Sequence, residues 1–183
     1  MSLSNLLKKI ADSEPGPETC ALFDFDGTVI SGYSATAFLK DQIARGELSP
    51  ADLIQLTQAA TRFGIGSLGF SALMAVHAQY LAGRSESEYV ANSERLFRRA
   101  IAKLVYPEAR QLIDAHRAKG HSIAIISSAT PYQVIPAAKD LGIDNVYATD
   151  LEVVDGHFTG SVVTPTCFGE GKVLAAEAFA ELN

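Results

Sequence analysis

The sequence predicts an α/β protein built on a Rossmann-like parallel sheet, with an inserted block of helices and a β-hairpin. One apolar strand candidate lies near the N-terminus, and about 70 residues with a helical apolar pattern follow it. After residue 105, helical and apolar extended segments alternate. Such alternation predicts parallel strands with helices on both faces of the sheet. Because the helical block is too long for a simple crossover, we expect it to be an insertion.

Composition and charge limit the partners that this chain can have. It has 183 residues, of which 48% are hydrophobic, and a formal net charge of -6. Nucleic acids and acidic membrane surfaces require clustered positive charge, so neither is expected as the main partner. The two cysteines, Cys20 and Cys167, form no CxxC pair, which predicts a reducing, cytoplasmic setting. No apolar run reaches the roughly 18 residues of a membrane span.

Three parts are expected along the chain. Residues 1–18 predict a short amphipathic helix and a Pro-Gly-Pro linker, which together form a peripheral extension. Residues 19–34 and 105–183 are expected to form the α/β core, and residues 35–104 the helical block.

The N-terminal half predicts one strand followed by helices. The strand is expected over residues 21–26, where Gly27 ends it. In the helical block, Ser49 precedes a proline at a first helical position, and Ser85 opens a capping-box pattern. The glycine-rich stretch 63–70 follows no strand, so we interpret it as a joint between helices and not as a phosphate loop.

The C-terminal half predicts helices and strands in turn. Asp155 and Gly156 lie between two extended segments and are typical of a two-residue hairpin turn. The elements expected are a helix over 107–119, a strand over 122–127, a helix over 131–141, a strand over 145–148, hairpin strands over 151–154 and 157–163, and a helix over 171–182.

Asp24 and Asp26 lie at the end of the first expected strand. Side chains two residues apart on a regular strand point the same way. Burying both carboxylates is costly unless a cation neutralises them or one holds a proton, and Mg²⁺ is the expected cation. Asp24 could then attack phosphorus, and Asp26 could act as acid and base. The alternative is an acidic turn without chemistry.

Ser127 ends the second expected strand, and Ser128 follows it, before a helix that Thr130 caps. A hydroxyl beside free backbone N–H groups at a helix N-terminus predicts a phosphate site, although the serines could simply help to cap the helix. Lys172 follows a glycine turn at the start of the last helix. It could neutralise a transferred phosphoryl group, or it could be a solvated surface charge.

These segments resemble the motifs of one enzyme superfamily, in its order. Residues 23–28 (Phe-Asp-Phe-Asp-Gly-Thr), 125–128 (Ile-Ile-Ser-Ser) and 169–172 (Gly-Glu-Gly-Lys) are similar to the first three motifs of the haloacid-dehalogenase superfamily. The helical block resembles the C1 cap of its phosphoserine-phosphatase-like branch, subfamily IB. The resemblance covers nearly everything from residue 20 onward and implies a haloacid-dehalogenase-like core.

The resemblance implies roles for five residues. Asp24 would be the nucleophile and a Mg²⁺ ligand, and Asp26 the acid/base, with its backbone carbonyl on the metal. Gly27 would offer a backbone N–H to the phosphate, and Ser127 its hydroxyl. Lys172 would pair with Asp24 and the phosphoryl oxygens. The presence of Asp26 favours hydrolysis of phosphate esters over dehalogenation.

The chain departs from the family pattern in two places. Residues 32–34 stand where phosphoserine phosphatases resemble one another in a glutamate that contacts the substrate amine. The fourth motif, an acidic loop after a further strand, does not occur before Asn183. We therefore expect the core to be C-terminally incomplete, as in a fragment or part of a longer protein. The first strand would then be an exposed edge, open to strand pairing or a further domain.

The leading functional hypothesis is a Mg²⁺-dependent phosphatase that hydrolyses a small phosphorylated metabolite through an aspartyl-phosphate. The alternative is a truncated or non-catalytic phosphate-binding module. The helical insertion disfavours a third class, the phosphate-accepting receiver domains.

Other side chains predict roles less specifically. Tyr33 and Phe38 could line the opening under the cap or pack in a core. Four histidines show no metal-ligand spacing, so packing or surface roles are expected for His77, His116, His121 and His157. Five arginines predict a solvated helix face, unless one of them reaches an anionic part of the substrate: Arg62, Arg84, Arg95, Arg98 and Arg99.

Overall fold

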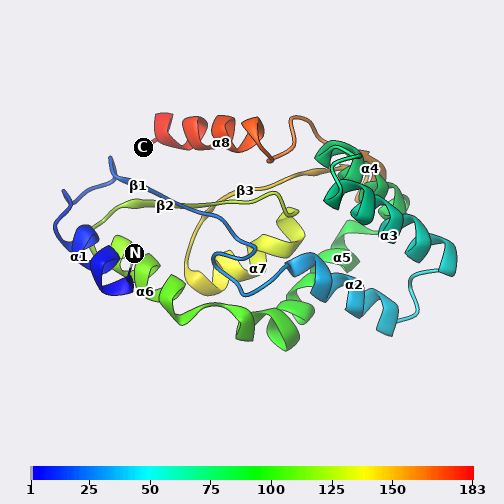
Figure 1. Cartoon of the computed structure of the whole chain (residues 1–183), viewed down its shortest axis with the longest axis horizontal. Coiled ribbons are helices and arrows are strands. Elements are labelled where there is room, and N and C mark those ends of the chain that lie inside the picture. Colours follow the sequence, from blue (N-terminus) through cyan, green and yellow to red (C-terminus); the bar gives the residue numbers. More distant parts are fainter. Residues whose placement is uncertain (1) are drawn as a thin grey trace.

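A three-stranded parallel sheet forms the centre of the fold. The computed structural model describes residues 2–183, so residue 1 of the expected extension 1–18 lies outside the described residues. The strands β1 (Cys20–Phe23), β2 (Ser122–Ile126) and β3 (Asn145–Tyr147) lie in the order β1-β2-β3. Helix α8 (Glu170–Glu181) covers one face, and α6 (Pro107–Ala118) and α7 (Pro131–Leu141) cover the other (Figure 1). The predicted α/β class is confirmed.

The first strand is shorter than the sequence predicts. It ends at Phe23 and not at Asp26, because the carbonyl oxygen of Phe25 accepts the backbone N–H groups of Val29 and Ile30, at 2.9 and 3.1 Å. These bonds turn the chain directly after Asp24. The two aspartates therefore lie on a turn, and the side-chain alternation of a regular strand does not decide their directions.

The segment between β1 and β2 is helical, as predicted. Ser49 caps its helix in a capping box with Asp52, and the side chain of Ser85 accepts the N–H of Glu88 at 3.5 Å. The glycine-rich stretch 63–70 is a joint between two helices. The elements are α2 (Ser34–Ala44), α3 (Pro50–Gly64), α4 (Phe70–Leu81), α5 (Glu86–Leu96), the π-helical turn η1 (Phe97–Ile101) and the 3₁₀ turn η2 (Ala102–Leu104).

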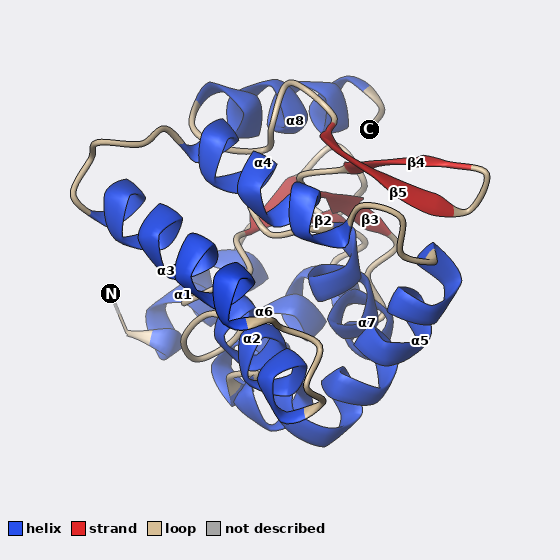
Figure 2. Ribbon diagram, turned by 90° about the vertical axis from the view of Figure 1, so that its right-hand side faces the viewer, coloured by secondary structure: helices blue, strands red, loops and turns tan. Residues whose placement is uncertain are grey.

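The predicted hairpin is present and packs against the helical block. Its strands are β4 (Leu151–Val154) and β5 (His157–Val162), set apart from the main sheet (Figure 2). Asp155 and Gly156 between them have φ values of 50° and 73°, as a type I′ turn requires. Phe158 of β5 exchanges backbone hydrogen bonds with Gly83 and Arg84, at 2.8 and 3.1 Å. The hairpin thereby ties the junction of α4 and α5 to the rest of the chain.

The N-terminal extension contains the expected helix, α1 (Leu3–Ala11), and docks on α6. Ile10 is only 8% exposed, and the ammonium group of Lys119 donates to the carbonyl oxygen of Ala11 at 3.0 Å. Among residues 2–183, no helix combines the length and the apolar character that crossing a bilayer requires.

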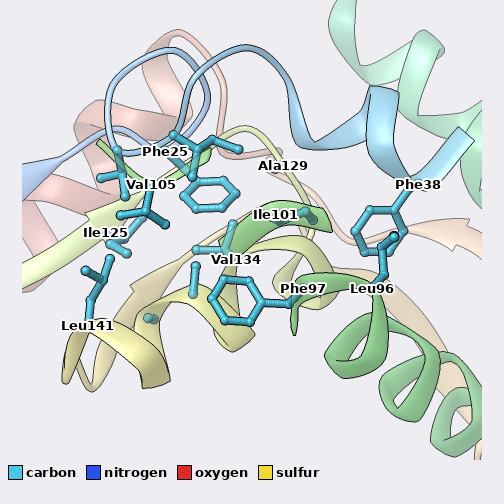
Figure 3. Packing of buried hydrophobic residues seen from close by; sticks show 14 of the residues in the cluster. Phe25, Phe38, Leu96, Phe97, Ile101, Val105, Ile125, Ala129, Val134 and Leu141 are labelled. Atoms are coloured by element: carbon cyan, nitrogen blue, oxygen red, sulfur yellow. The ribbon is translucent and has the colours of Figure 1, made fainter. Parts of the chain in front are cut away.

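One apolar core runs from the sheet into the helical block. Figure 3 shows Ile125 and Leu141 toward one end of this cluster and Phe38 and Leu96 toward the other. Phe25, between the two aspartates, has no exposed surface. Its burial anchors the turn that carries both carboxylates.

Replacing Ile125 by alanine should lower the free energy of unfolding by about 2–5 kcal/mol, because it opens a cavity in the central strand. Ile54→Ala is the matched control, since Ile54 is 57% exposed, and should change stability by less than about 0.5 kcal/mol. Urea unfolding measures both, and equal losses would contradict the position of the core.

Candidate active site

Asp24 forms an ion pair with Lys172 from the other end of the chain. The ammonium nitrogen of Lys172 lies 2.7 Å from Oδ1 of Asp24, and the two side chains are 31% and 45% exposed. An ion pair this exposed contributes only about 0–1 kcal/mol to stability. The contact therefore matters chiefly for chemistry: it holds a cation beside a carboxylate that still faces solvent.

Two glycines place Lys172 near the carboxyl end of β1. Gly169 precedes α8 with φ 55°, a conformation that favours glycine. Gly171 approaches the backbone so closely that a Cβ atom would lie 1.9 Å from the carbonyl oxygen of Thr166. Only glycine permits this contact, and the next residue of the helix is the lysine that reaches Asp24.

Asp26 is more enclosed than Asp24 and accepts two hydrogen bonds from one residue. Ser34 donates its backbone N–H to Oδ1 at 2.7 Å and its hydroxyl to Oδ2 at 3.2 Å. The pKa of Asp26 is raised, because burial disfavours the charged form more than the bonds from Ser34 favour it. The negative charge of Asp24 adds to the rise, and Lys172 opposes it. A raised pKa suits a carboxyl group that must give and take a proton.

A buried polar chain extends from Ser34 to α7. The side-chain amide of Gln133 donates to the hydroxyl of Ser34 at 3.0 Å. The amide oxygen of Gln133 accepts the N–H and the hydroxyl of Thr130, at 2.8 and 3.0 Å. All three residues are at most 8% exposed, so these bonds form in a poorly solvated place where they fix geometry. Asp26 is thereby oriented by residues of α2 and α7.

Ser127 lies at the end of β2, beside the end of β1. Phe23 pairs with Ile125 in the parallel sheet. Asp24 and Ser127 therefore both lie at the carboxyl ends of the strands. Ser127 is 1% exposed, and its oxygen accepts the N–H of Ala129 at 3.1 Å. The N–H of Thr130 is also taken, by Gln133. The predicted free amides are thus occupied at these two positions, and what Ser127 can offer an anion is its hydroxyl proton.

Ser128 and Gly27 occupy less decisive positions. Ser128 is partly exposed, between Ser127 and the start of α7. Gly27, with φ 74°, donates its backbone N–H to the carbonyl oxygen of Gly32 at 2.9 Å. A phosphate could use that N–H only after this bond breaks, so the role expected of Gly27 stays a prediction.

The carboxylates offer a small donor set for a metal. Among residues 2–183, no group of three or more histidine, cysteine, aspartate or glutamate side chains could hold an ion. Mg²⁺ is often bound through one or two carboxylates, with substrate phosphate and water as the other ligands. Asp24 and Asp26 fit that manner of binding, because their mutual repulsion is relieved by a cation.

The sequence located the charged groups of the site but not the groups that orient them. Ser34, Gln133 and Thr130 were missed as site residues, although Thr130 and Gln133 have capping-box spacing. Ser34 and Gln133 lie 99 residues apart in sequence, so no local pattern connects them. Tyr33 is 71% exposed, whereas Phe38 is 7% exposed and belongs to the core.

Comparison with known proteins identifies the family. The family model of haloacid dehalogenase-like hydrolases matches residues 21–183. The chain therefore belongs to the haloacid dehalogenase-like hydrolases, as the three motifs predicted.

Several similar curated proteins come from mycobacteria. A putative hydrolase of Mycobacterium leprae is 31% identical over 165 residues, which cover 87% of this chain and 55% of the relative. Phosphoserine phosphatase SerB1 of Mycobacterium tuberculosis is 32% identical over 165 residues, covering 87% of this chain and 53% of that protein. The chain thus spans about half the length of these relatives.

Solved structures share the fold. A Bordetella pertussis protein of unknown function superposes with a TM-score of 0.80 at 25% identity, over 90% of this chain and 74% of that one. A substrate-bound phosphoserine phosphatase superposes with a TM-score of 0.64 at 19% identity, over 93% and 72% of the two chains. The second likeness concerns the fold alone.

Gly171→Ala should lower the free energy of unfolding by about 1–3 kcal/mol, because the added Cβ forces the first turn of α8 away from Thr166. The matched control is Gly64→Ala at the end of α3, where a Cβ meets nothing within 4 Å. That change should leave stability unchanged or raise it by up to about 1 kcal/mol. Equal effects in urea unfolding would show that Gly171 is not needed for close approach.

Asp26→Asn should raise the melting temperature at neutral pH. The raised pKa means that the folded state binds the proton of Asp26 more tightly than the unfolded state does. The charged form of Asp26 therefore lowers the free energy of unfolding at pH values above the folded-state pKa. This loss becomes smaller as the pH falls toward 3.8, the ordinary pKa of an aspartate. The gain should vanish at the acid end of a pH series.

The measurement is thermal unfolding with a chelator present, because bound metal would stabilise the folded state separately. Asp144→Asn at an exposed position is the control and should change little. A lower melting temperature for Asp26→Asn at neutral pH would contradict the assigned cost.

Proposed function

We propose that the protein is a Mg²⁺-dependent phosphatase that hydrolyses a small-molecule phosphate monoester through an aspartyl-phosphate. The observation that carries this proposal is the contact of Lys172 with Asp24 at 2.7 Å, beside a second carboxyl group whose pKa is raised. A nucleophile, a cation for the phosphoryl oxygens and a proton donor then lie together at the carboxyl ends of the strands. Membership of the hydrolase family supports the same reaction.

The first half of the proposed reaction transfers the phosphoryl group to the protein. The free carboxylate oxygen of Asp24 attacks phosphorus, and the bond to the substrate's alcohol oxygen breaks. Protonated Asp26 gives its proton to that oxygen, so a neutral alcohol leaves. Lys172 and the hydroxyl of Ser127 stabilise the negative charge on the phosphoryl oxygens.

The second half releases phosphate. Asp26, now a carboxylate, takes a proton from a water molecule as that water attacks the phosphoryl group. The bond to Asp24 breaks, and both carboxyl groups return to their starting states. Mg²⁺ held by Asp24 and the backbone carbonyl of Asp26 would offset the charge of the nucleophile and the phosphate.

We also propose that residues 35–104 act as a cap on a core formed by residues 19–34 and 105–183. In Figure 1 the helices α2–α5 gather beyond the ends of β1 and β2, on the side where Asp24 and Ser127 lie. A cap there can exclude water from the reacting groups. The expected extension, residues 1–18, would brace α6 through its helix α1.

The free edge of β1 leaves room for a further contribution to the site. Among residues 2–183, β1 has a strand neighbour on one side only, and Leu22 on it is 44% exposed. We propose that this edge pairs with a further strand, which could supply additional metal ligands. Without such ligands the chain could bind phosphate without hydrolysing a phosphate ester, which is the alternative function.

Asp24→Asn should abolish phosphate release from phosphate monoesters in the presence of Mg²⁺, because an amide is not a nucleophile toward phosphorus. We expect a loss in kcat of at least about 10³-fold, comparable to losses of other covalent nucleophiles. Phosphate release under saturating substrate measures it.

Glu177→Gln is the control, since Glu177 lies on α8 five residues beyond Lys172 and outside the described site. It should keep the activity of the unaltered protein. Activity that survives Asp24→Asn would contradict the covalent route. Phosphate binding without any turnover by the unaltered protein would favour the non-catalytic alternative.

A further inference from the structure

A groove lined by positive side chains runs along the outside of the helical block, between α2 and the segment formed by α5, η1 and η2. It consists of two hollows of about 430 and 530 Å³, which adjoin because Asp41, Leu96 and Arg99 line both of them. The cations that line the two hollows together are Lys40, Arg45, Arg95, Arg98, Arg99 and Lys103.

The charge of this basic groove is opposite to that of the rest of the chain. Its lining has six positive side chains and one negative side chain, Asp41, which give a net charge of +5. The whole chain has a formal net charge of -6, so the residues outside the groove carry -11. A hollowed surface with one sign of charge concentrates ions of the opposite sign. The basic groove therefore attracts anions that the remaining surface repels.

A nearly buried carboxylate holds two arginines at the junction of the hollows. The side chain of Asp41 is 9% exposed, and its Oδ2 lies 2.9 Å from Nε of Arg45. Its Oδ1 pairs with the guanidinium group of Arg99. Arg45 also pairs with Glu47 at 2.5 Å, whereas the side chain of Arg99 is 69% exposed. Because a guanidinium group has five N–H donors, Arg99 keeps donors for a ligand while Asp41 fixes its direction.

Three cations follow one another along the wall formed by α5, η1 and η2. Arg95, Arg99 and Lys103 are each four residues apart, and like charges at this spacing destabilise a helix. Among residues 2–183, neither Arg95 nor Lys103 forms an ion pair with a carboxylate, and the same holds for Lys40 and Arg98. An anion in the basic groove would relieve this repulsion.

The basic groove lies on the opposite side of α2 from the residue that holds Asp26. Ser34 and Phe38, four residues apart, share a buried face of α2. Thr36 and Lys40 are shifted by two residues, which is about half a turn, and they are exposed and line the groove. Neither hollow is lined by Asp24, Asp26, Ser127 or Lys172. The groove is therefore separate from the groups of the candidate active site.

We propose that the basic groove is a binding site for a small anion with several phosphate-type charges, such as a polyphosphate. Guanidinium groups match the geometry of phosphate oxygens, and the lining offers charge for several of them. A long polyanion would extend past the groove to the acidic remainder of the chain, because charge is screened only over about 8–10 Å. A small ligand avoids that repulsion. The proposal does not rest on the phosphatase reaction.

Titration calorimetry of the whole chain tests the ligand class, with inorganic tripolyphosphate and inorganic phosphate as probes and a chelator present. Tripolyphosphate should bind at least about ten-fold more tightly than phosphate, because it can accept charge-assisted hydrogen bonds from several cations at once. Its affinity should fall as sodium chloride is added, since the groove is open to solvent and its charges are screened.

Two double variants test the location. Lys40→Gln with Lys103→Gln removes two cations of the larger hollow, and Arg95→Gln with Arg98→Gln removes two of the smaller. Each should weaken tripolyphosphate binding by at least about ten-fold. Because these side chains pair with no carboxylate among residues 2–183, neither double variant should melt lower than the parent.

Lys8→Gln with Lys9→Gln is the matched control. Both lysines are exposed on α1, and their loss changes the net charge by the same amount. Tripolyphosphate should bind this control as it binds the parent. It should also bind Lys172→Gln with unchanged affinity, because Lys172 belongs to the candidate active site and not to the groove.

Four results would overturn the proposal. Equal loss of binding in the groove variants and the control would show an unspecific effect of net charge, and loss in Lys172→Gln would place the anion at the candidate active site. A clear fall in melting temperature for a groove variant would show that its cations have partners within the fold. Tighter binding to vesicles of phosphatidylglycerol or to single-stranded DNA than to tripolyphosphate would assign the groove to a larger partner.

Discussion

The turn at Phe25 is the constraint on which the site depends. The ring of Phe25 is fully buried, and the carbonyl oxygen of Phe25 accepts hydrogen bonds from the N–H groups of residues that follow. The chain must therefore leave the sheet between two aspartates, one exposed beside Lys172 and one enclosed beside Ser34. Two carboxyl groups two residues apart thus acquire different environments, which is what separate roles as nucleophile and acid/base require.

The enclosed aspartate also connects the two parts of the fold. Ser34 opens the helical block and donates hydrogen bonds to Asp26, and Gln133 of α7 donates to the hydroxyl of Ser34. If the helical block changed its position, the orientation of Asp26 would change with it. The position of the helical block and the orientation of Asp26 are therefore physically linked in this arrangement.

Local patterns predicted much of this fold. The apolar strand before Asp24, the proline-started helices and the Asp155-Gly156 turn each carry their signal within a few residues, and the structure contains all of them. The predicted end of β1 at Asp26 was wrong. The strand ends earlier because of hydrogen bonds to the Phe25 carbonyl, and the alternation of apolar and polar residues does not predict these bonds. The order of the three motifs predicted that Asp24 and Lys172 lie close together. The contact of Ser34 with Gln133 arises only from tertiary packing, so the sequence could not predict it.

The covalent intermediate is the central claim, and locating the phosphoryl group tests it most directly. The protein would be mixed with a phosphate monoester and Mg²⁺, quenched in acid during turnover, and digested for peptide mass spectrometry. The account predicts one phosphoryl group on the peptide that contains Asp24, bound to Asp24 itself and absent when the ester is omitted. Phosphate release with no phosphorylated residue, or with the phosphoryl group on another residue, would contradict it.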